Sequence, residues 1–397
     1  MKKIHFALCS ILLLASCGAS NQTVDGKSYI DSFSKAYDAS YSAGSYFMTT
    51  TSSGVTLALG VRNLNETDDT YYHIEGSGLT FDIGAKGLKG SDASDLEGEL
   101  VLKGGTLSLK TDAKETSAFS DFMKISPVKA KAYFDGGALY LDASGNKNSE
   151  TNSTIGLALQ TLIQKASGDS DYSLVGGGSV ITGGTKYKGK WALKDEDKQK
   201  ISDKMPLVKD GETLSDYFSL SSLIEGAYED PNGATAFSFV TKEDGTKRIV
   251  FDSKDKTVLT GALTAGFASF SDTLDKSESV PSKDEVKEKV EKFFTYATPT
   301  LFRIETLFTD KGVSQITYDI NFTLDEGKVK EAHPDGMIDL SENASSSDDP
   351  NDYKFNLDGS LTFSGTLRTS FGSGVTFSLP DLSGYKDFPV ISKGSEE

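Results

Sequence analysis

The chain has 397 residues, and its 41 lysines and arginines against 58 aspartates and glutamates give a formal net charge of −17 at pH 7. Such an acidic chain lacks the electrostatic attraction that draws basic proteins to nucleic acids and anionic membranes, so we expect no nucleic-acid partner. The length suits one large domain or two ordinary ones with a sizeable hydrophobic core.

The first residues have the pattern of an export signal. Lys2 and Lys3 form a basic segment, and residues 4–14 are an apolar run broken only by His5 and Ser10. This run is about half of the roughly 20 residues that a membrane-spanning helix needs. Its length and its basic flank are typical of a signal that is cleaved during export.

The apolar run ends in Leu14, Ala15, Ser16 and Cys17. These residues resemble the lipobox of bacterial lipoproteins, which has a branched apolar residue, two small residues and a cysteine. The resemblance implies that residues 14–16 are recognised for signal cleavage and that Cys17, as first residue of the mature chain, carries diacylglycerol and fatty acyl groups such as palmitate. The alternative is an ordinary secretory signal whose cleavage region contains a cysteine.

A lipid anchor suits the rest of the chain. Loss of Lys2 and Lys3 with residues 1–16 changes the formal charge from −17 to −19, so a membrane attachment through lipid on Cys17 is expected. Cys9 leaves with the signal, and no disulfide is then possible. We predict an exported protein that is lipid-anchored in the cell envelope, on the outer face of the plasma membrane or on an outer membrane.

Four segments follow from these patterns. Residues 1–16 are the signal peptide, residues 17–27 a lipidated flexible tether, residues 28–388 a β-rich body and residues 389–397 a tail. The body is one large domain, or two that split near residues 272–282, where the sequence "SDTLDKSESVPS" is linker-like.

The body is predicted to begin with a helix that ends at Gly44, because apolar residues recur three and four positions apart: Ile30, Phe33, Tyr37 and Tyr41. From residue 46 to residue 142 the apolar period is two, which predicts seven or eight antiparallel strands. Glycine pairs predict two-residue hairpin turns at 104–105 and within 135–137.

The middle of the chain mixes helical and strand patterns. Ser153 is expected to cap a helix, and a glycine-rich break follows at residues 176–184. Further along, the patterns predict a short strand and a polar helix within 186–200 and a helix over 214–228. Strands at 237–239 and 249–251 are expected to form a hairpin with its turn at 244–245, and a strand is expected over 258–270.

Ser282 and Glu285 fit a capping box, which predicts a helix that starts at residue 283 and stops near Pro299. The clearest strand alternation follows, at every second residue of 316–324, and further strands are expected at 355–363 and 375–379 with an acidic loop between them at 341–352.

Alternation of this kind makes one face of each strand apolar, and that face must be covered. The predicted fold class is therefore α+β and β-dominated. We expect a large curved antiparallel sheet, half-barrel-like, that is covered by several amphipathic helices.

Catalytic patterns are missing. Apart from His5 the histidines are His73, expected at a surface position of a strand, and His333, expected in an exposed turn. Neither belongs to a recognisable nucleophile or metal-binding motif, and residues 142–150 lack a glycine and a final glutamate at the places that a calcium loop requires. We expect no enzyme activity, no catalytic residue, no metal site and no cofactor.

The segments "GGALYLD" at 136–142 and "YKGKWALK" at 187–194 resemble short strand motifs of other lipoproteins. The order of elements is similar to that of half-barrel lipid-carrier lipoproteins of the LolA/LprG type. This resemblance implies a hydrophobic cleft on a curved sheet. The 23 phenylalanines and 16 tyrosines fit either ordinary core packing or the lining of such a cleft.

The expected function is therefore a non-catalytic, membrane-anchored envelope lipoprotein that binds a lipid or another apolar ligand in a cleft of the sheet. The alternative is a structural or interaction lipoprotein of the cell surface, adhesin- or antigen-like, with a closed core. The sequence assigns no ligand-binding residue.

Overall fold

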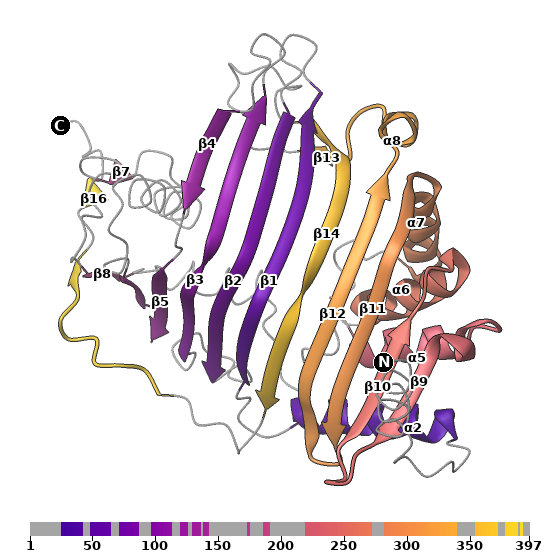
Figure 1. Cartoon of the computed structure of the whole chain (residues 1–397). Coiled ribbons are helices and arrows are strands. Elements are labelled where there is room, and N and C mark those ends of the chain that lie inside the picture. The colour runs from indigo at the N-terminus through magenta and orange to yellow at the C-terminus, as the bar shows by residue number, and fades with distance from the viewer. Residues whose placement is uncertain are drawn as a thin grey trace, which may run out of the picture.

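The protein is built on one large open sheet (Figure 1). The structure is a computed structural model, and it describes residues 25–42, 48–64, 71–86, 97–112, 120–125, 129–135, 138–142, 173–174, 186–190, 219–271, 282–339, 354–371, 378–387 and 390–391.

Among the described residues, the N-terminal half supplies one helix and most of the strands at one end of the sheet. Its elements are α2 (Gly26–Ser42), β1 (Met48–Asn63), β2 (Tyr71–Lys86), β3 (Glu97–Asp112), β4 (Ser120–Ile125), β5 (Ala130–Asp135), β6 (Ala138–Asp142), β7 (Ser173–Leu174) and β8 (Lys186–Lys190).

The C-terminal half supplies the other helices and the strands of the opposite end. Its elements are α5 (Leu220–Glu229), the 3-10 helix η4 (Gly233–Ala236), β9 (Phe237–Thr241), β10 (Lys247–Asp252), α6 (Lys256–Ser271), α7 (Lys283–Tyr296), β11 (Ala297–Thr309), β12 (Gly312–Leu324), α8 (Glu326–Ala332), β13 (Ile338–Asp339), β14 (Lys354–Phe371), β15 (Lys386–Asp387) and β16 (Val390–Ile391).

The 14 strands of the main sheet follow the order β15-β8-β6-β5-β3-β2-β1-β14-β12-β11-β10-β9, with β4 beside β3 and β13 beside β14. Every pairing is antiparallel except the short one between β15 and β8. β14, from late in the chain, lies between β1 and β12 and so joins the N-terminal strands to the C-terminal ones. The prediction of a β-dominated α+β fold with a large antiparallel sheet is confirmed.

The hydrophobic core lies at the β9–β12 end of the sheet. In Figure 1 the helices α5, α6 and α7 gather at this end, and α2 packs against β11, β12 and α5. β11 shows the alternation of a strand with one covered face, since Phe302, Ile304 and Phe308 are buried. The core contains residues from both sides of positions 272–282, such as Val258 and Val290, and a split near these positions stays a prediction.

The β1–β3 part of the sheet is different. Residues 71–86 of β2 are mostly half-buried on both faces, and no helix of the described segments packs across β1, β2 or β3. Val55 is an exception, with 2% of its surface exposed. Burial is therefore concentrated at one end of the sheet.

Residues of α2 are fixed to the turn between β11 and β12. The hydroxyl of the buried Ser40 donates to the carbonyl of Ala36 at 2.8 Å and accepts from the backbone N–H of Val313 at 3.1 Å. Gly312 has φ +144°, and a Cβ atom there would lie 2.5 Å from the Ser40 hydroxyl. Phe33 of the same helix meets Phe308 edge-on at 5.3 Å. The helix predicted from the spacing of Ile30 and its neighbours is confirmed.

The hairpin predicted at Gly104-Gly105 is wrong, because β3 continues through both glycines. Gly105 has φ +105°, and a Cβ atom there would lie 2.7 Å from the Cα of Leu79 on the neighbouring strand. The register between β2 and β3 shifts at this place, so the glycine pair forms a bulge, which needs the same conformational freedom as a turn. The described part of residues 46–142 holds six strands, β1 to β6, where seven or eight are predicted for the whole segment.

The strand predicted over residues 258–270 is also wrong, since these residues belong to the helix α6. Val258, Leu259 and Ala262 are all buried on one side of it. Its small residues face α5, where a Cβ atom at Gly226 would clash with the Cβ of Ala265. Close packing between the two helices has overridden the strand preference of the threonines and the valine in α6.

Several other predictions are confirmed by the pairing. The turn between β5 and β6 joins Asp135 to Ala138, β9 and β10 form the expected hairpin, and the capping box of Ser282 and Glu285 opens α7. β12 covers the clear alternation at 316–324, and β14 covers 355–363.

Some predicted segments lie partly or wholly outside the described residues. They are the signal and most of the tether (residues 1–24), the helix after Ser153, the break at 176–184, the polar helix after 190, residues 214–218, the loop at 341–352 and residues 375–377. The strand predicted at 375–379 is wrong in its described part, because residues 378–380 do not belong to a strand. Val390 and Ile391 of the predicted tail pair with β7.

Candidate functional site

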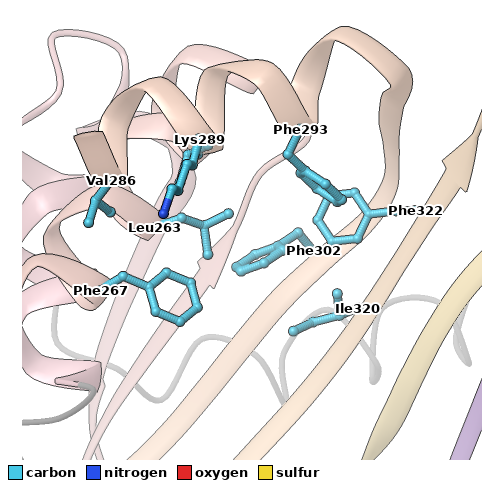
Figure 2. A pocket seen from close by; sticks show the side chains of 9 residues that line it. Leu263, Phe267, Val286, Lys289, Phe293, Phe302, Ile320 and Phe322 are labelled. Atoms are coloured by element: carbon cyan, nitrogen blue, oxygen red, sulfur yellow. The ribbon is translucent and has the colours of Figure 1, made fainter. Parts of the chain in front are cut away.

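A hydrophobic pocket lies between two helices and the sheet, with a volume of about 500 Å³ (Figure 2). This volume falls within the range of about 300–1,000 Å³ that is usual for ligand sites. α6, α7, β11 and β12 all contribute to its lining, which consists of Leu263, Phe267, Val286, Lys289, Val290, Phe293, Phe302, Ile320 and Phe322.

The floor of the pocket comes from two neighbouring strands. Phe302 on β11 pairs directly with Ile320 on β12, so both side chains stand on the same face of the sheet. Phe322, two residues further along β12, stands beside them, with its ring centroid 6.1 Å from that of Phe302. Phe302 and Phe322 are only 3% and 4% exposed, which makes this floor part of the core.

The wall from α7 follows from helical spacing. Val286, Val290 and Phe293 lie four and three residues apart, so they project from one side of the helix. Phe293 meets Phe322 edge-on with ring centroids 5.4 Å apart. The capping box at Ser282 fixes where the helix starts, and thereby the height of these residues above the strands.

α6 supplies the rim opposite to α7. Leu263 is partly buried and packs against the core. Phe267, one turn later, is 46% exposed, although the residues earlier in the helix, such as Leu259, are completely buried. A large aromatic side chain at the edge of an apolar hollow is typical of a site that receives another molecule.

Lys289 on α7 is the one charged residue in this lining. Figure 2 shows its nitrogen directed toward the end of the pocket where Leu263 and Phe267 lie. Within the described part of the chain, no carboxylate forms an ion pair with it. The carboxylate of Glu285, four residues earlier, accepts from the backbone N–H of Ser282 at 2.5 Å. That bond is the largest cause of the lowered pKa of Glu285, and the charge of Lys289 lowers it further.

The sequence indicated only part of this site. Ile320 and Phe322 belong to the alternating run that predicted β12, and Val286, Val290 and Phe293 to the predicted helix. Leu263 and Phe267 were missed because residues 258–270 were expected to be a strand. The predicted lipidation residue Cys17 and the cleavage residues Leu14, Ala15 and Ser16 lie outside the described residues.

A second group of polar residues lies on the β1–β3 part of the sheet. His73 contacts the hydroxyl of Tyr71 through Nδ1 at 3.2 Å and the carboxylate of Glu75 through Nε2 at 2.9 Å. Lys110 on β3 donates to the other oxygen of Glu75 at 2.9 Å. This hydrogen bond is the main cause of the lowered pKa of the Glu75 carboxyl.

His73 therefore lies on a strand, as expected, in a row of hydrogen-bonded side chains. These bonds run between residues two apart on one strand and to a neighbour on the next, which is the normal geometry of cross-strand pairs. The row holds no serine or cysteine nucleophile.

His333 follows α8, and it is half-buried rather than exposed as expected. Its Nε2 lies 3.3 Å from the hydroxyl of the buried Tyr296. Burial lowers the pKa of His333, and the nearby charge of Lys292 lowers it further. This histidine helps to close the end of the core beside α7.

In the segments that the structure describes, no group of three or more histidine, cysteine, aspartate or glutamate side chains is arranged to hold a metal ion. Among the same residues, no helix combines the length and apolar character needed to cross a membrane. No protein-family model, curated protein or solved structure matches the chain.

Proposed function

We propose that the protein is a non-catalytic envelope lipoprotein, anchored through lipid on Cys17, that binds a lipid or another apolar ligand in the pocket between α6, α7 and the sheet. The pocket carries this proposal, because eight of its nine lining residues are apolar. A cleft of this composition has few groups with which to catalyse a reaction, and it favours ligands that gain from leaving water.

We further propose the more detailed form of the predicted fold, and the pocket between helices and strands supports its helix cover. In that form the sheet curves like a half-barrel, and amphipathic helices cover its apolar face. Leu263 of α6 and Phe293 of α7 pack against the core that contains Phe302 and Phe322, and the pocket lies beside them.

Ligand binding is tested by filling the pocket. Leu263→Trp places a larger ring in the hollow and is expected to weaken the binding of a fluorescent fatty acid about tenfold, which corresponds to about 1.4 kcal/mol. Leu301→Trp is the matched control, because Leu301 is 36% exposed on β11 and does not line the pocket. Equal binding by both variants and the parent protein would refute this site.

The anchor is tested separately in cells that produce the full chain. Cys17→Ala is expected to abolish labelling by radioactive palmitate and to leave the signal uncleaved, because the residue that resembles the lipid acceptor is gone. Replacement of Cys9, which lies within the apolar run of the signal, should leave labelling intact. Labelling that persists in Cys17→Ala would contradict the proposal.

A surface interaction or structural role is the second candidate, and the β1–β3 part of the sheet favours it. Residues on both faces of β2 are half-exposed, so these strands offer a broad surface to a partner. If the protein acts in this way, Leu263→Trp leaves its function in cells unchanged, whereas charge substitutions at exposed positions of β2 and β3 abolish it.

A further inference from the structure

The pocket has two unlike ends. At one end Phe302 and Phe322 are almost completely buried and form an aromatic floor with Phe293. At the other end Phe267 is 46% exposed, and Figure 2 shows the nitrogen of Lys289 directed toward this end. A molecule that fits both ends is apolar over most of its length and polar at its exposed end.

The charge of Lys289 specifies that polar end further. A lysine lines apolar surface with its methylene stem while its ammonium stays in contact with water. An anionic group beside the ammonium gains a charge-assisted hydrogen bond there, whereas a cationic group is repelled.

The nearby carboxylates do not take this place. Glu285 is held in the capping box by the backbone of Ser282. Glu291 lies 3.7 Å from the ammonium of Lys287, on the same helix. Within the described part of the chain, Lys289 therefore has no ion-pair partner.

We infer that the pocket takes a single-chain amphiphile with an anionic head group, namely a fatty acid, whose carboxylate pairs with Lys289 while its chain lies on Phe302 and Phe322. This inference rests on the proposed binding function and adds the charge of the ligand. The volume of about 500 Å³ lies in the lower half of the usual range for ligand sites, which favours one acyl chain over a lipid with two or more.

The test compares three ligands that have twelve carbons in a linear chain and differ in head-group charge: laurate, dodecanol and dodecylamine. Each displaces Nile red, a neutral fluorescent dye, from the full chain carrying Cys17→Ala, which has no acyl chain of its own to compete. At neutral pH we expect laurate to bind about twofold to fivefold more tightly than dodecanol, and dodecylamine to bind most weakly, since a partly exposed ion pair has effects of this size. Added salt should reduce the difference.

Lys289→Met keeps most of the stem and removes the charge, so it should abolish the preference for laurate while the binding of dodecanol stays the same. Lys287→Met is the matched control. It removes a lysine from the same helix that does not line the pocket, and the preference should survive. A preference that persists in Lys289→Met, or equal binding of laurate and dodecanol by the parent protein, would overturn the inference while leaving the apolar site intact.

Failure of the proposed function looks different. In that case none of the three ligands displaces the dye, or Leu263→Trp binds them as well as the parent protein does. If the pocket instead receives a second copy of the chain, sedimentation shows a dimer that Leu263→Trp dissociates, and this result also overturns the inference.

Discussion

Thr306 lies on the covered face of β11, opposite Ile249, and none of its surface is exposed. Its hydroxyl oxygen has no hydrogen-bond partner among the described residues. A buried hydroxyl without a partner loses its hydrogen bonds to water and gains nothing in return. Thr306 is therefore a weak point within the core.

Thr306→Val replaces the hydroxyl by a methyl group of nearly the same size, and we expect it to raise the free energy of unfolding by about 1 kcal/mol. Urea denaturation followed by circular dichroism measures the change. Thr260→Val is the control, because the hydroxyl of Thr260 donates to the carbonyl of Lys256 at 2.7 Å and its loss should not stabilise the protein. A destabilised Thr306→Val protein would show that this hydroxyl has a partner after all.

Individual residues also show where sequence reasoning stops. The capping box at Ser282 could be predicted because its two hydrogen bonds join residues three positions apart. Phe267 and Phe322 line the same pocket although they are far apart in the sequence, and no local pattern reveals that they share a cavity. The exposure of Phe267 is likewise a property of the folded surface.

At the scale of elements, the contact between α5 and α6 depends on small residues. A Cβ atom at Gly226 would clash with the Cβ of Ala265 and lie 3.1 Å from the carbonyl oxygen of Gly261. A Cβ atom at Gly261 would lie 3.5 Å from the nearest atom, the carbonyl oxygen of Gly226, which is an ordinary contact. The two glycines face each other, but only Gly226 is required by the packing.

We therefore expect Gly226→Ala to lower the free energy of unfolding by about 1–3 kcal/mol, the usual effect of overpacking. Gly261→Ala should be neutral or stabilising by up to about 1 kcal/mol, since alanine is the better helix former. Thermal or urea denaturation of the two variants gives the comparison. If both variants lose the same stability, the helices are not as closely packed as the structure shows.

The composition and the burial of α6 explain why its residues predict a strand. Its threonines, glycines and β-branched residues lower helix propensity, and Val258 and Leu259, both buried, hide the helical period. By contrast, the apolar residues of β12 alternate with polar ones from Ile316 to Leu324, and the prediction there was right. Elements whose burial follows one regular period are predictable, and elements shaped by a close neighbour are not.

At the scale of the whole molecule, burial is uneven along a single sheet. The β10 residues Ile249 and Phe251 have no exposed surface, while most residues of β2 are half-exposed. The hydrogen bonds of β2 are thus protected mainly by neighbouring strands, whereas β10 and β11 contribute buried side chains to the same core as the helices. The two ends of the sheet should differ in local stability.

Amide hydrogen exchange followed by mass spectrometry tests this difference. We expect the amides of β2 and β3 to exchange through openings that cost less free energy than those of β10 and β11, which should exchange only on global unfolding. Both sets belong to one antiparallel sheet, so each serves as the control for the other. Equal opening free energies at both ends would show that the sheet unfolds as one cooperative unit.

α2 is attached near both of its ends to the β9–β12 end of the sheet. Gly26 begins this helix beside Tyr228 and Phe239, and Ser40 holds its other end to Val313. If Cys17 carries the anchor, the chain between Cys17 and Gly26 reaches at most about 30 Å when fully stretched. With such an anchor, residues 17–26 join the membrane to the end of the sheet that contains the pocket. This end of the sheet then stays within reach of the bilayer surface.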